Sequence, residues 1–347
     1  MMPLDVLHVL GSAQPEGTGV VRIVRGLAAE LDPSKYRTHV CFLESVGPLV
    51  GDFQAAGVPV VALDWWTGGL NPLGAFRFWK YLRGRNFAVV HQHFGARAVR
   101  QVIRRASDAR VVLHLHGLVL ESAIIQGADQ VIAASQAIAR GVPNLKPIVI
   151  YGGVALPEEP ANHLPEGAGI VIGAACRITV SKGLADLIRA FATLSHEFPD
   201  LSLEIAGDGP QRRQLENEVR QTGMGDRVRF LGWQRHMDAR FARWDIFAMP
   251  SLDEGFGMAV IEAMASALPV VGTNVGGLPE IIENDHTGYL VNPSDHADLA
   301  NHLRLLIGNA ERRLAMGIAG RERIRACFGV KKMAGATAAV YDSVLRK

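Results

Sequence analysis

The stretch DIFAMPSLDEGFGMAVIEAMASALPVVGT, residues 245–273, decides the fold class of this chain. Its two ends, DIFAMPS and PVVGT, are short apolar runs of the kind that form buried strands, and the run between them has the length of a helix. A strand that is apolar throughout, followed by a helix and a second such strand, is typical of a parallel sheet covered by helices. The stretch therefore predicts an α/β fold.

The same alternation fills the rest of the chain in two sets. The first set of apolar runs is VLHVLG, HVCFLE, PVVALD, FAVVHQH, RVVLHLHG, QVIAAS and IVIYGG. A linker with several prolines and glycines, residues 156–169, separates it from IVIGAACRI, LSLEIAGDG, VRFLGW, DIFAMPS and PVVGT. We expect two Rossmann-like domains, residues 1–155 and 170–329, with a cleft between them. A C-terminal helix, about residues 330–347, is expected to pack back on the first domain.

Composition indicates a globular protein with two cores. Of the 347 residues, 48% are hydrophobic and 20% are charged. The net charge of +2 argues against a nucleic-acid partner, although residues 1–155 are the basic half, with 15 Lys and Arg against 10 Asp and Glu. The three cysteines have no disulfide or metal spacing and are expected to be reduced and buried. With no signal peptide and no long apolar span, these features predict a cytoplasmic location.

Two groups of residues after strands suit a phosphorylated ligand, because ligands in such folds bind beyond the carboxyl ends of the strands. Gly17 and Gly19 precede a helix, where backbone N–H groups can approach a phosphate or sugar. Taken alone, this pattern is more often a simple turn, and the G-x-G-x-x-G pattern of a dehydrogenase is absent. Arg177 and Lys182 flank the start of another helix and predict a diphosphate site. Without neighbouring evidence, two solvated surface cations are the commoner interpretation.

Five motifs in register resemble glycosyltransferase family 4, the retaining enzymes of the GT-B fold. They are RITVSKGLADLIRAFA, LEIAGDGPQRRQLE, VRFLGW, FAMPSLDEGFGMAVIEAMASALPVVGTNVGGLPEII and TGYLVNP. The resemblance is strong over residues 148–300 and looser before them, where ADQVIAASQAIARGV and IVIYGGV match family segments. It implies a GT-B fold and a retaining hexosyltransferase that moves a sugar from a nucleotide diphosphate sugar to a hydroxyl acceptor.

The resemblance also assigns roles to two glutamates that, without it, would suggest a solvated helix face. In similar enzymes the first residue of a Glu-x7-Glu pair, here Glu254, hydrogen-bonds the donor sugar, and the second, here Glu262, holds the ribose hydroxyls. The backbone N–H groups of Phe256, Gly257 and Met258 are expected to face the sugar and phosphate. Two helical turns give roughly 12 Å of reach, about the distance from the sugar to the ribose across a diphosphate.

Other strand ends contribute expected contacts of the donor. His116 matches the family segment that brings a histidine to the donor sugar, whereas His93 is more simply interpreted as a packed residue. Gly232 and Trp233 lie where similar enzymes hold the nucleotide base, although Trp233 suits a core position equally well. The family commonly has Asn where this chain has Gly152, so any contact from that side chain is missing here.

The catalytic residues inferred in this way are Glu254, His116, Arg177 and Lys182, and no metal or other cofactor is expected. The charge of a departing nucleoside diphosphate must be neutralised by a metal ion or by fixed positive groups. Arg177, Lys182 and the N-termini of helices can supply that charge. Asp208 is not part of an Asp-x-Asp pair, and no His or Cys cluster has zinc spacing.

Residues 65–85 combine tryptophans and phenylalanines with lysine and arginines. Such a segment suits a lipid headgroup interface, and a minority hypothesis is therefore a peripheral protein on the inner face of the cell membrane. Its acceptor would then be lipid-linked, in cell-surface polysaccharide or glycolipid synthesis. A helix that packs its aromatic residues on the sheet is the commoner interpretation of the same pattern. Two alternatives to a transferase stay open: a GT-B-type nucleotide-sugar epimerase and a non-catalytic nucleotide-sugar-binding subunit.

Overall fold

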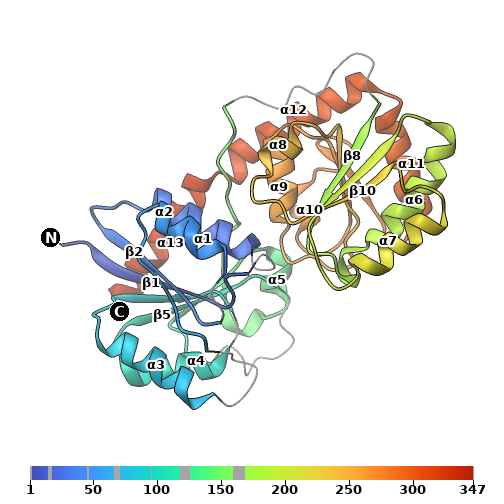
Figure 1. Cartoon of the computed structure of the whole chain (residues 1–347). Helices are drawn as coiled ribbons and strands as arrows, with labels where there is room; N and C mark the ends of the chain where they lie inside the picture. Colours follow the sequence, from blue (N-terminus) through green and yellow to red (C-terminus); the bar gives the residue numbers. More distant parts are fainter. Residues whose placement is uncertain are drawn as a thin grey trace. The chain divides into compact units, whose positions relative to one another are not determined.

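The computed structural model describes residues 2–14, 18–44, 47–65, 71–94, 96–117, 126–158 and 169–346. The chain divides into two compact units (Figure 1). Unit 1 comprises Met1–Gly153 and Val330–Lys347, and unit 2 comprises Val154–Gly329. The chain therefore leaves unit 1 once and returns to it after unit 2. Among the described helices, none combines the length and the apolar character needed to cross a lipid bilayer.

Unit 1 is built on a seven-stranded sheet in the order β3-β2-β1-β4-β5-β6-β7. The strands are β1 (Leu4–Leu10), β2 (Tyr36–Phe42), β3 (Val60–Ala62), β4 (Val89–Gln92), β5 (Arg110–Leu115), β6 (Gln130–Ala133) and β7 (Ile148–Val149). All neighbouring strands run parallel. The strand order changes direction between β1 and β4, and such a switch point is where open α/β sheets bind ligands.

Helices cover both faces of this sheet. They are α1 (Thr18–Glu30), α2 (Leu49–Ala55), α3 (Pro72–Arg83), α4 (Arg97–Ala106), α5 (Gln136–Arg140), the short η3 (Pro143–Leu145) and α13 (Val330–Leu345). Asn71 is the N-cap of helix α3, because its side chain accepts a hydrogen bond from Gly74 N at 2.9 Å. Pro72 follows it at the first helical position, where proline is favoured. Phe78 and Ile103 place α3 and α4 against one face of the sheet in a single apolar cluster.

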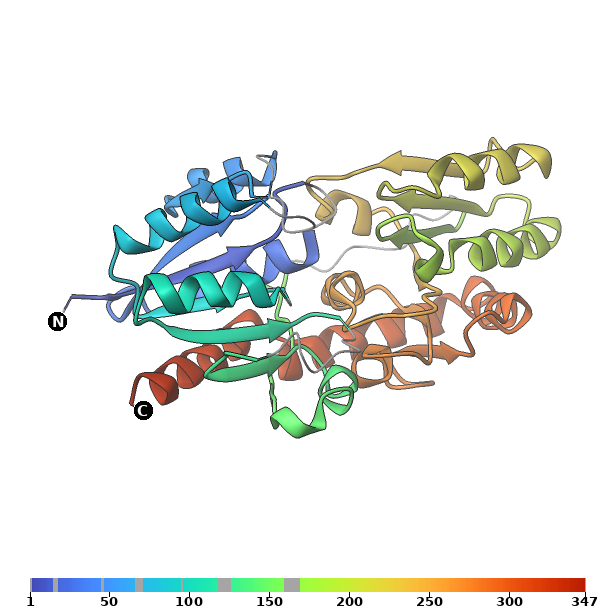
Figure 2. The same ribbon diagram turned by 90° about the horizontal axis from the view of Figure 1, so that it is seen from below.

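Helix α13 completes unit 1 although it follows unit 2 in the chain. It lies beside the strands of the unit 1 sheet (Figure 2) and packs on α1, where a Cβ added to Gly26 would come within 2.8 Å of Val330. The Tyr36 hydroxyl donates a hydrogen bond to Asp342 at 2.5 Å and joins α13 to β2. This hydrogen bond joins residues that are 306 positions apart in the sequence.

Unit 2 is built on a six-stranded parallel sheet in the order β10-β9-β8-β11-β12-β13. The strands are β8 (Val171–Ala175), β9 (Ser202–Ala206), β10 (Val228–Gly232), β11 (Ile246–Met249), β12 (Val270–Thr273) and β13 (Gly288–Val291). The prediction of parallel sheets alternating with helices is confirmed in both units. The strands predicted for this second unit leave out β13, whose run GYLV begins with glycine.

The helices of unit 2 enclose its sheet. They are η4 (Val180–Lys182), α6 (Leu184–Glu197), α7 (Arg212–Gln221), α8 (Asp238–Phe241), α9 (Met258–Ala265), α10 (Leu278–Ile281), α11 (His296–Ile307) and α12 (Ala310–Cys327). Helices α6 and α11 pack together, and α9 packs on α12. Trp244 is fully buried against Gly173, and its indole N–H donates to Glu204 Oε2 at 2.9 Å. The core therefore supports the loops that follow β8 and β11.

Candidate functional site

Glu254 lies in the loop between β11 and α9, at the carboxyl end of the central strands of unit 2. Lys182, at the end of η4, donates a hydrogen bond from Nζ to Glu254 Oε2 at 2.8 Å. Both side chains are largely covered, with 20% of Lys182 and 14% of Glu254 exposed. The structure thus brings together two of the predicted catalytic residues, one from each of two neighbouring strand-to-helix connections.

The Glu254 loop is held by hydrogen bonds from both sides. The Ser251 hydroxyl, which is fully buried, approaches Glu254 Oε2 at 3.4 Å. Its carbonyl oxygen accepts from the Thr273 hydroxyl at 2.5 Å, which joins the loop to β12. On the other side Leu252 N donates to Ser181 O at 2.7 Å. Ser251 therefore supports the loop.

Two glycines let neighbouring backbones approach this loop closely. Gly183, with a φ of 62°, precedes α6, and a Cβ there would lie 1.9 Å from Pro250 O. Gly276 has a φ of 53°, and a Cβ there would lie 1.7 Å from Glu254 O. Gly277 N donates to the same oxygen at 3.1 Å. Because both contacts are made by backbone atoms, only glycine suits either position.

The N-terminus of α9 contains the backbone N–H groups that the sequence predicts to face the sugar and phosphate. Gly257, with a φ of 113°, immediately precedes the helix, and Phe256 is buried beside it against Phe328. Met258 is the first helical residue and is half-buried. Glu262 is also half-buried but lies only just over one turn into α9, because the helix starts at Met258. The expected reach of two full helical turns from Glu254 is therefore wrong.

Arg177 follows β8 and its side chain is exposed. No ion pair links it to another residue in the part of the chain that the structure describes, so its guanidinium is available to an anion. Gly232 ends β10 with a φ of 68°, and its carbonyl oxygen accepts from Gly207 N at 2.8 Å. Trp233 is half-buried, and its indole N–H finds no acceptor among the described residues.

In unit 1, His116 follows β5, and its Nε2 lies 3.0 Å from Nδ1 of His93. His93 in turn contacts Nδ1 of His8 through its Nε2, also at 3.0 Å. Burial lowers the pKa of His116 to about 3, so the imidazole is neutral at pH 7 and can accept or donate a hydrogen bond. Sequence reasoning treated these histidines one at a time and missed that they form one cluster.

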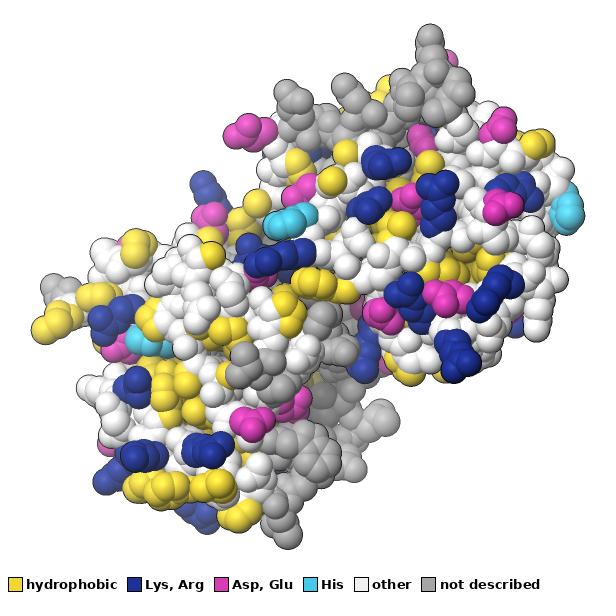
Figure 3. Space-filling view, in the orientation of Figure 1, with side chains coloured by type: hydrophobic (Ala, Val, Ile, Leu, Met, Phe, Trp, Pro, Cys, Tyr) yellow, Lys and Arg dark blue, Asp and Glu magenta, His cyan; other side chains and the backbone are white. Residues whose placement is uncertain are grey.

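The remaining predicted positions are less informative. Gly19 is the second residue of α1, and Gly17 lies outside the described residues. Of the segment 65–85, residues 66–70 also lie outside them. Helix α3 agrees in part with both interpretations of this segment. Phe78 is fully buried, as in a helix packed on the sheet, whereas Leu73 and Phe76 are 59% and 55% exposed, as in a lipid-facing surface. Hydrophobic and basic side chains lie side by side over α3 (Figure 3).

The three cysteines are free, as expected, but only Cys41 is buried; Cys176 and Cys327 are half-buried. Candidate metal ligands occur in unit 1, where the described residues include two overlapping groups of three histidines. The first group is His8, His91 and His93, and the second is His93, His114 and His116.

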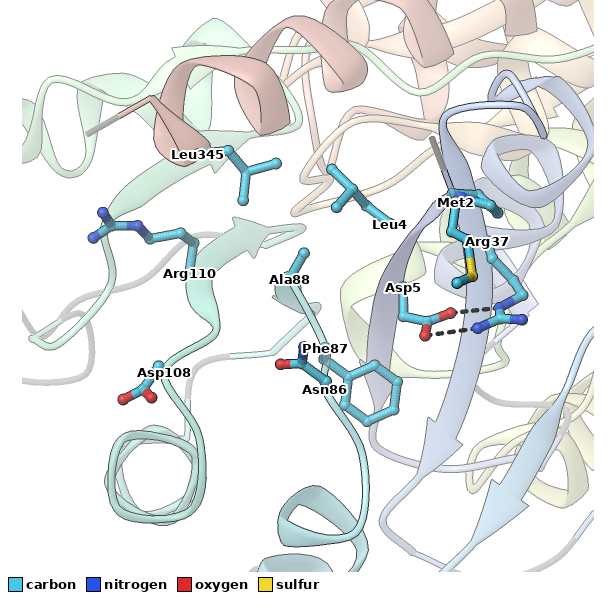
Figure 4. A pocket seen from close by; sticks show the side chains of 11 residues that line it. Met2, Leu4, Asp5, Arg37, Asn86, Phe87, Ala88, Asp108, Arg110 and Leu345 are labelled. Atoms are coloured by element: carbon cyan, nitrogen blue, oxygen red, sulfur yellow. Dashed lines mark hydrogen bonds and ion pairs between the residues drawn. The ribbon is translucent and has the colours of Figure 1, made fainter.

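A pocket of about 510 Å³ opens in unit 1 where the amino ends of the strands lie (Figure 4). Its lining includes Leu4, Asp5 and Ala88 at the amino ends of β1 and β4. Asp5 accepts two hydrogen bonds from the Arg37 guanidinium, and these bonds hold the pKa of Asp5 below its ordinary value. Because substrates of α/β sheets bind at the carboxyl ends of the strands, this pocket is not the candidate active site.

Comparison with known families accounts for nearly the whole chain. Residues 17–156 match glycosyltransferase family 4, and residues 157–323 match the glycosyl transferases group 1. Among curated relatives, N-acetyl-alpha-D-glucosaminyl L-malate synthase of Bacillus anthracis is 34% identical over 165 residues, which are 48% of this chain and 43% of the relative. The 2-deoxystreptamine glucosyltransferase of Streptomyces kanamyceticus is 34% identical over 53% of this chain and 48% of the relative. The chain thus aligns with about half the length of these relatives.

Solved structures agree with the fold over the full chain. Anabaena HepE in complex with UDP and glucose superposes with a TM-score of 0.84 at 21% identity and covers 98% of this chain and 100% of that chain. A glycosyltransferase from Rickettsia africae gives a TM-score of 0.83 at 20% identity, with 99% of each chain covered. The two sheets, the family matches and these superpositions agree with one another. The chain belongs to the GT-B glycosyltransferases of group 1, glycosyltransferase family 4.

Proposed function

We propose that this protein is a retaining glycosyltransferase that moves a sugar from a nucleotide diphosphate sugar to a hydroxyl acceptor. The observation that carries the proposal is the Lys182–Glu254 pair, with 2.8 Å between Nζ and Oε2. The pair stands beside the N-terminus of α9 in a chain that matches two glycosyltransferase families. A covered cation next to a carboxylate can bind a diphosphate and a sugar hydroxyl at the same time.

The leaving diphosphate is stabilised by fixed positive groups. Lys182 and the exposed Arg177 supply two full charges, and the backbone N–H groups at the start of α9 supply partial ones. Because the backbone N–H groups are held in place by α9 before the reaction, they stabilise the charge that develops on the departing phosphate without reorganising, while Lys182 and Arg177 turn their side chains toward it. We infer that no divalent cation is required for this step.

Glu254 and Glu262 hold the two ends of the donor. Glu254 accepts hydrogen bonds from sugar hydroxyls while Lys182 turns toward the phosphate, and Glu262 binds the ribose. His116, whose burial keeps its imidazole neutral by lowering its pKa, contacts the donor sugar by hydrogen bonding. Gly232 and Trp233 border the base. HepE was solved with UDP and glucose, so UDP-glucose is the first donor to test.

Retention follows from the resemblance to the family. The acceptor attacks from the face that the diphosphate leaves, within a tight ion pair, and the leaving phosphate accepts the acceptor proton. Unit 1 selects the acceptor, and the exposed Leu73 and Phe76 with the cations of α3 support a lipid-linked one. On this basis the enzyme acts in cell-surface polysaccharide or glycolipid synthesis, at the inner face of the membrane.

The roles of the two glutamates are separated by comparing Glu254→Gln, Glu262→Gln and the control Glu311→Gln, an exposed residue of α12. Binding of UDP and of UDP-glucose is measured by calorimetry, and transfer by product analysis with labelled donor and lipid extracts. Glu262→Gln is expected to weaken both ligands. Glu254→Gln is expected to leave UDP binding nearly unchanged while lowering kcat, because its contact strengthens in the transition state.

The opposite pattern would refute these roles. If Glu254→Gln abolished UDP binding and Glu262→Gln left it unchanged, the donor would have to lie the other way along α9. If every nucleotide sugar failed to bind to the folded wild-type protein, the proposed function itself would be wrong.

A further inference from the structure

Five histidines share one face of the unit 1 sheet. His8 of β1 stands opposite His91 of β4 in the strand register. Gln92 of β4 stands opposite Leu113 of β5, and the residues that follow these two are His93 and His114. Because side chains alternate between the two faces of a strand, the members of each His-x-His pair point the same way. The register of three neighbouring strands therefore gathers these side chains, which the linear sequence keeps far apart.

Of the two groups of three histidines, His8, His91 and His93 form the one in which every member is buried. His8 and His91 are fully buried, and His93 is 4% exposed. One ring nitrogen from each lies within 4.8 Å of those of the other two. His8 Nδ1 and His93 Nε2 are 3.0 Å apart, close to the roughly 3.3 Å that separates two nitrogens bound to one tetrahedral zinc ion.

Several nitrogens of this cluster have no hydrogen-bond partner among the described residues. Nε2 of His8 and Nε2 of His91 are buried and make no hydrogen bond with the described residues, and the same holds for both ring nitrogens of His114. A buried polar atom without a partner typically costs about 1–3 kcal/mol. Unpaired nitrogens in a buried cluster therefore call for an explanation, and a bound ligand on His91 Nε2 is one.

We propose that His8, His91 and His93 form a binding site for one transition-metal ion, of which zinc fits best. Three neutral imidazoles are good ligands for zinc, whereas magnesium and calcium take oxygen ligands. Three protein ligands leave the fourth tetrahedral position open for water.

Tyr341 of α13 acts on the site from outside the ligand set. Its hydroxyl lies 2.6 Å from Nδ1 of His91 and therefore fixes the orientation of the ring, with Nε2 as the nitrogen that faces the cluster. An oxygen partner on the second nitrogen is the usual arrangement of a metal-bound histidine, because it fixes the tautomer and raises the basicity of the ligand. The stacked rings of His91 and His93, whose centroids are 4.2 Å apart, have to turn slightly toward the ion on binding.

The alternative for the same cluster is a set of neutral imidazoles that hydrogen-bond one another and hold no metal. That arrangement satisfies His8 Nδ1 and both nitrogens of His93, but it leaves His91 Nε2, the nitrogen that the metal would bind, without a partner among the described residues; His8 Nε2 is unpaired in both arrangements. The two arrangements differ in a direct measurement, the metal content of the folded protein.

The test uses the full chain without an affinity tag. Metal content is measured on the purified protein, and the chelator-stripped protein is then titrated with zinc and with cobalt, whose visible absorption is intense only in four-coordinate sites. We expect about one zinc per chain. His8→Asn and His91→Asn should lose this binding, and Tyr341→Phe should weaken it roughly tenfold to a hundredfold. His286→Asn, at an exposed histidine of unit 2, is the control and should bind like the wild type.

Tyr341→Phe keeps the experiment decisive if the histidine variants do not fold, because it removes only one hydroxyl. Wild-type protein that takes up neither zinc nor four-coordinate cobalt would overturn the proposal. So would cobalt binding of equal affinity in wild type, His8→Asn, His91→Asn and Tyr341→Phe, since the ion would then be held elsewhere.

Discussion

Replacing Gly276 with alanine is a sensitive test of the active-site geometry, because this residue sets the position of the Glu254 backbone. A methyl group at Gly276 would lie 1.7 Å from the Glu254 carbonyl oxygen, and ordinary contact begins at 3.4 Å. The oxygen must therefore retreat by about 1.7 Å. It would also lose its 3.1 Å hydrogen bond from Gly277 N.

Two effects of this substitution can be separated by magnitude. Alanine at a φ of 53° costs roughly 1–2 kcal/mol of stability through backbone strain alone. The displaced loop carries Glu254 away from its position beside Lys182, and a displacement of about 1 Å at a catalytic group can lower the rate about a hundredfold. We therefore expect kcat/KM to fall roughly a hundredfold or more, while the protein stays folded.

Gly223→Ala is the matched control. Gly223 also has a positive φ, of 70°, in the same unit, but a Cβ there has no atom within 4 Å. This variant should show the strain effect on the thermal transition without the loss of activity. Transfer rates and thermal unfolding are measured for both variants. If Gly276→Ala transferred sugar as fast as Gly223→Ala, or if both lost activity equally, the loop would not depend on this backbone contact.

Four further expectations concern other parts of the molecule. Lys182→Ala and Arg177→Ala should each weaken nucleoside diphosphate binding roughly tenfold to a hundredfold; unchanged affinity by calorimetry in both would remove them from the site. Transfer should proceed without added Mg²⁺ or Mn²⁺, and an absolute requirement restored by titration would contradict a leaving-group site made of fixed charges. Phe76→Ser should reduce sedimentation with anionic lipid vesicles, and equal binding would argue against α3 as the contact surface. Asp5→Asn should destabilise the protein above pH 3.8, where the wild-type carboxylate is ionised, and the difference should vanish as the pH falls through the lowered pKa of Asp5; a constant difference in urea denaturation would contradict this.

The elements of the fold that were predictable from sequence are those with continuous apolar runs. The strands β8 and β11 are bounded by turn residues and buried on both faces, so their pattern is clear without a structure. The strand β13 is as long as β11, but its run GYLV begins with Gly288 and has three apolar residues where β11 has four, so its pattern is weaker.

The candidate site was predictable only where its residues are close in sequence. Glu254 and Gly257 belong to the same loop between β11 and α9, and their spacing in the sequence predicts a site there. The pairing of Glu254 with Lys182 joins two connections and needed the coordinates. For the histidines the decisive information is strand register, since His8 and His91 become neighbours only when β1 pairs with β4. A pair of His-x-His patterns at strand ends was the available signal, and it becomes significant once the strand order is known.

The return of α13 to unit 1 has a consequence for synthesis of the protein. The strands β1 to β7 emerge from the ribosome before α13, with the whole of unit 2 made in between. Until α13 has been synthesised, Tyr36 lacks its partner Asp342 and His91 lacks its partner Tyr341. The apolar face of α1 that packs on α13 is also uncovered. Unit 2, which is continuous in sequence, can therefore finish folding first, although it is made second. The nascent first unit must meanwhile avoid aggregation, and ribosome stalling or chaperone binding before residue 330 would act at this stage.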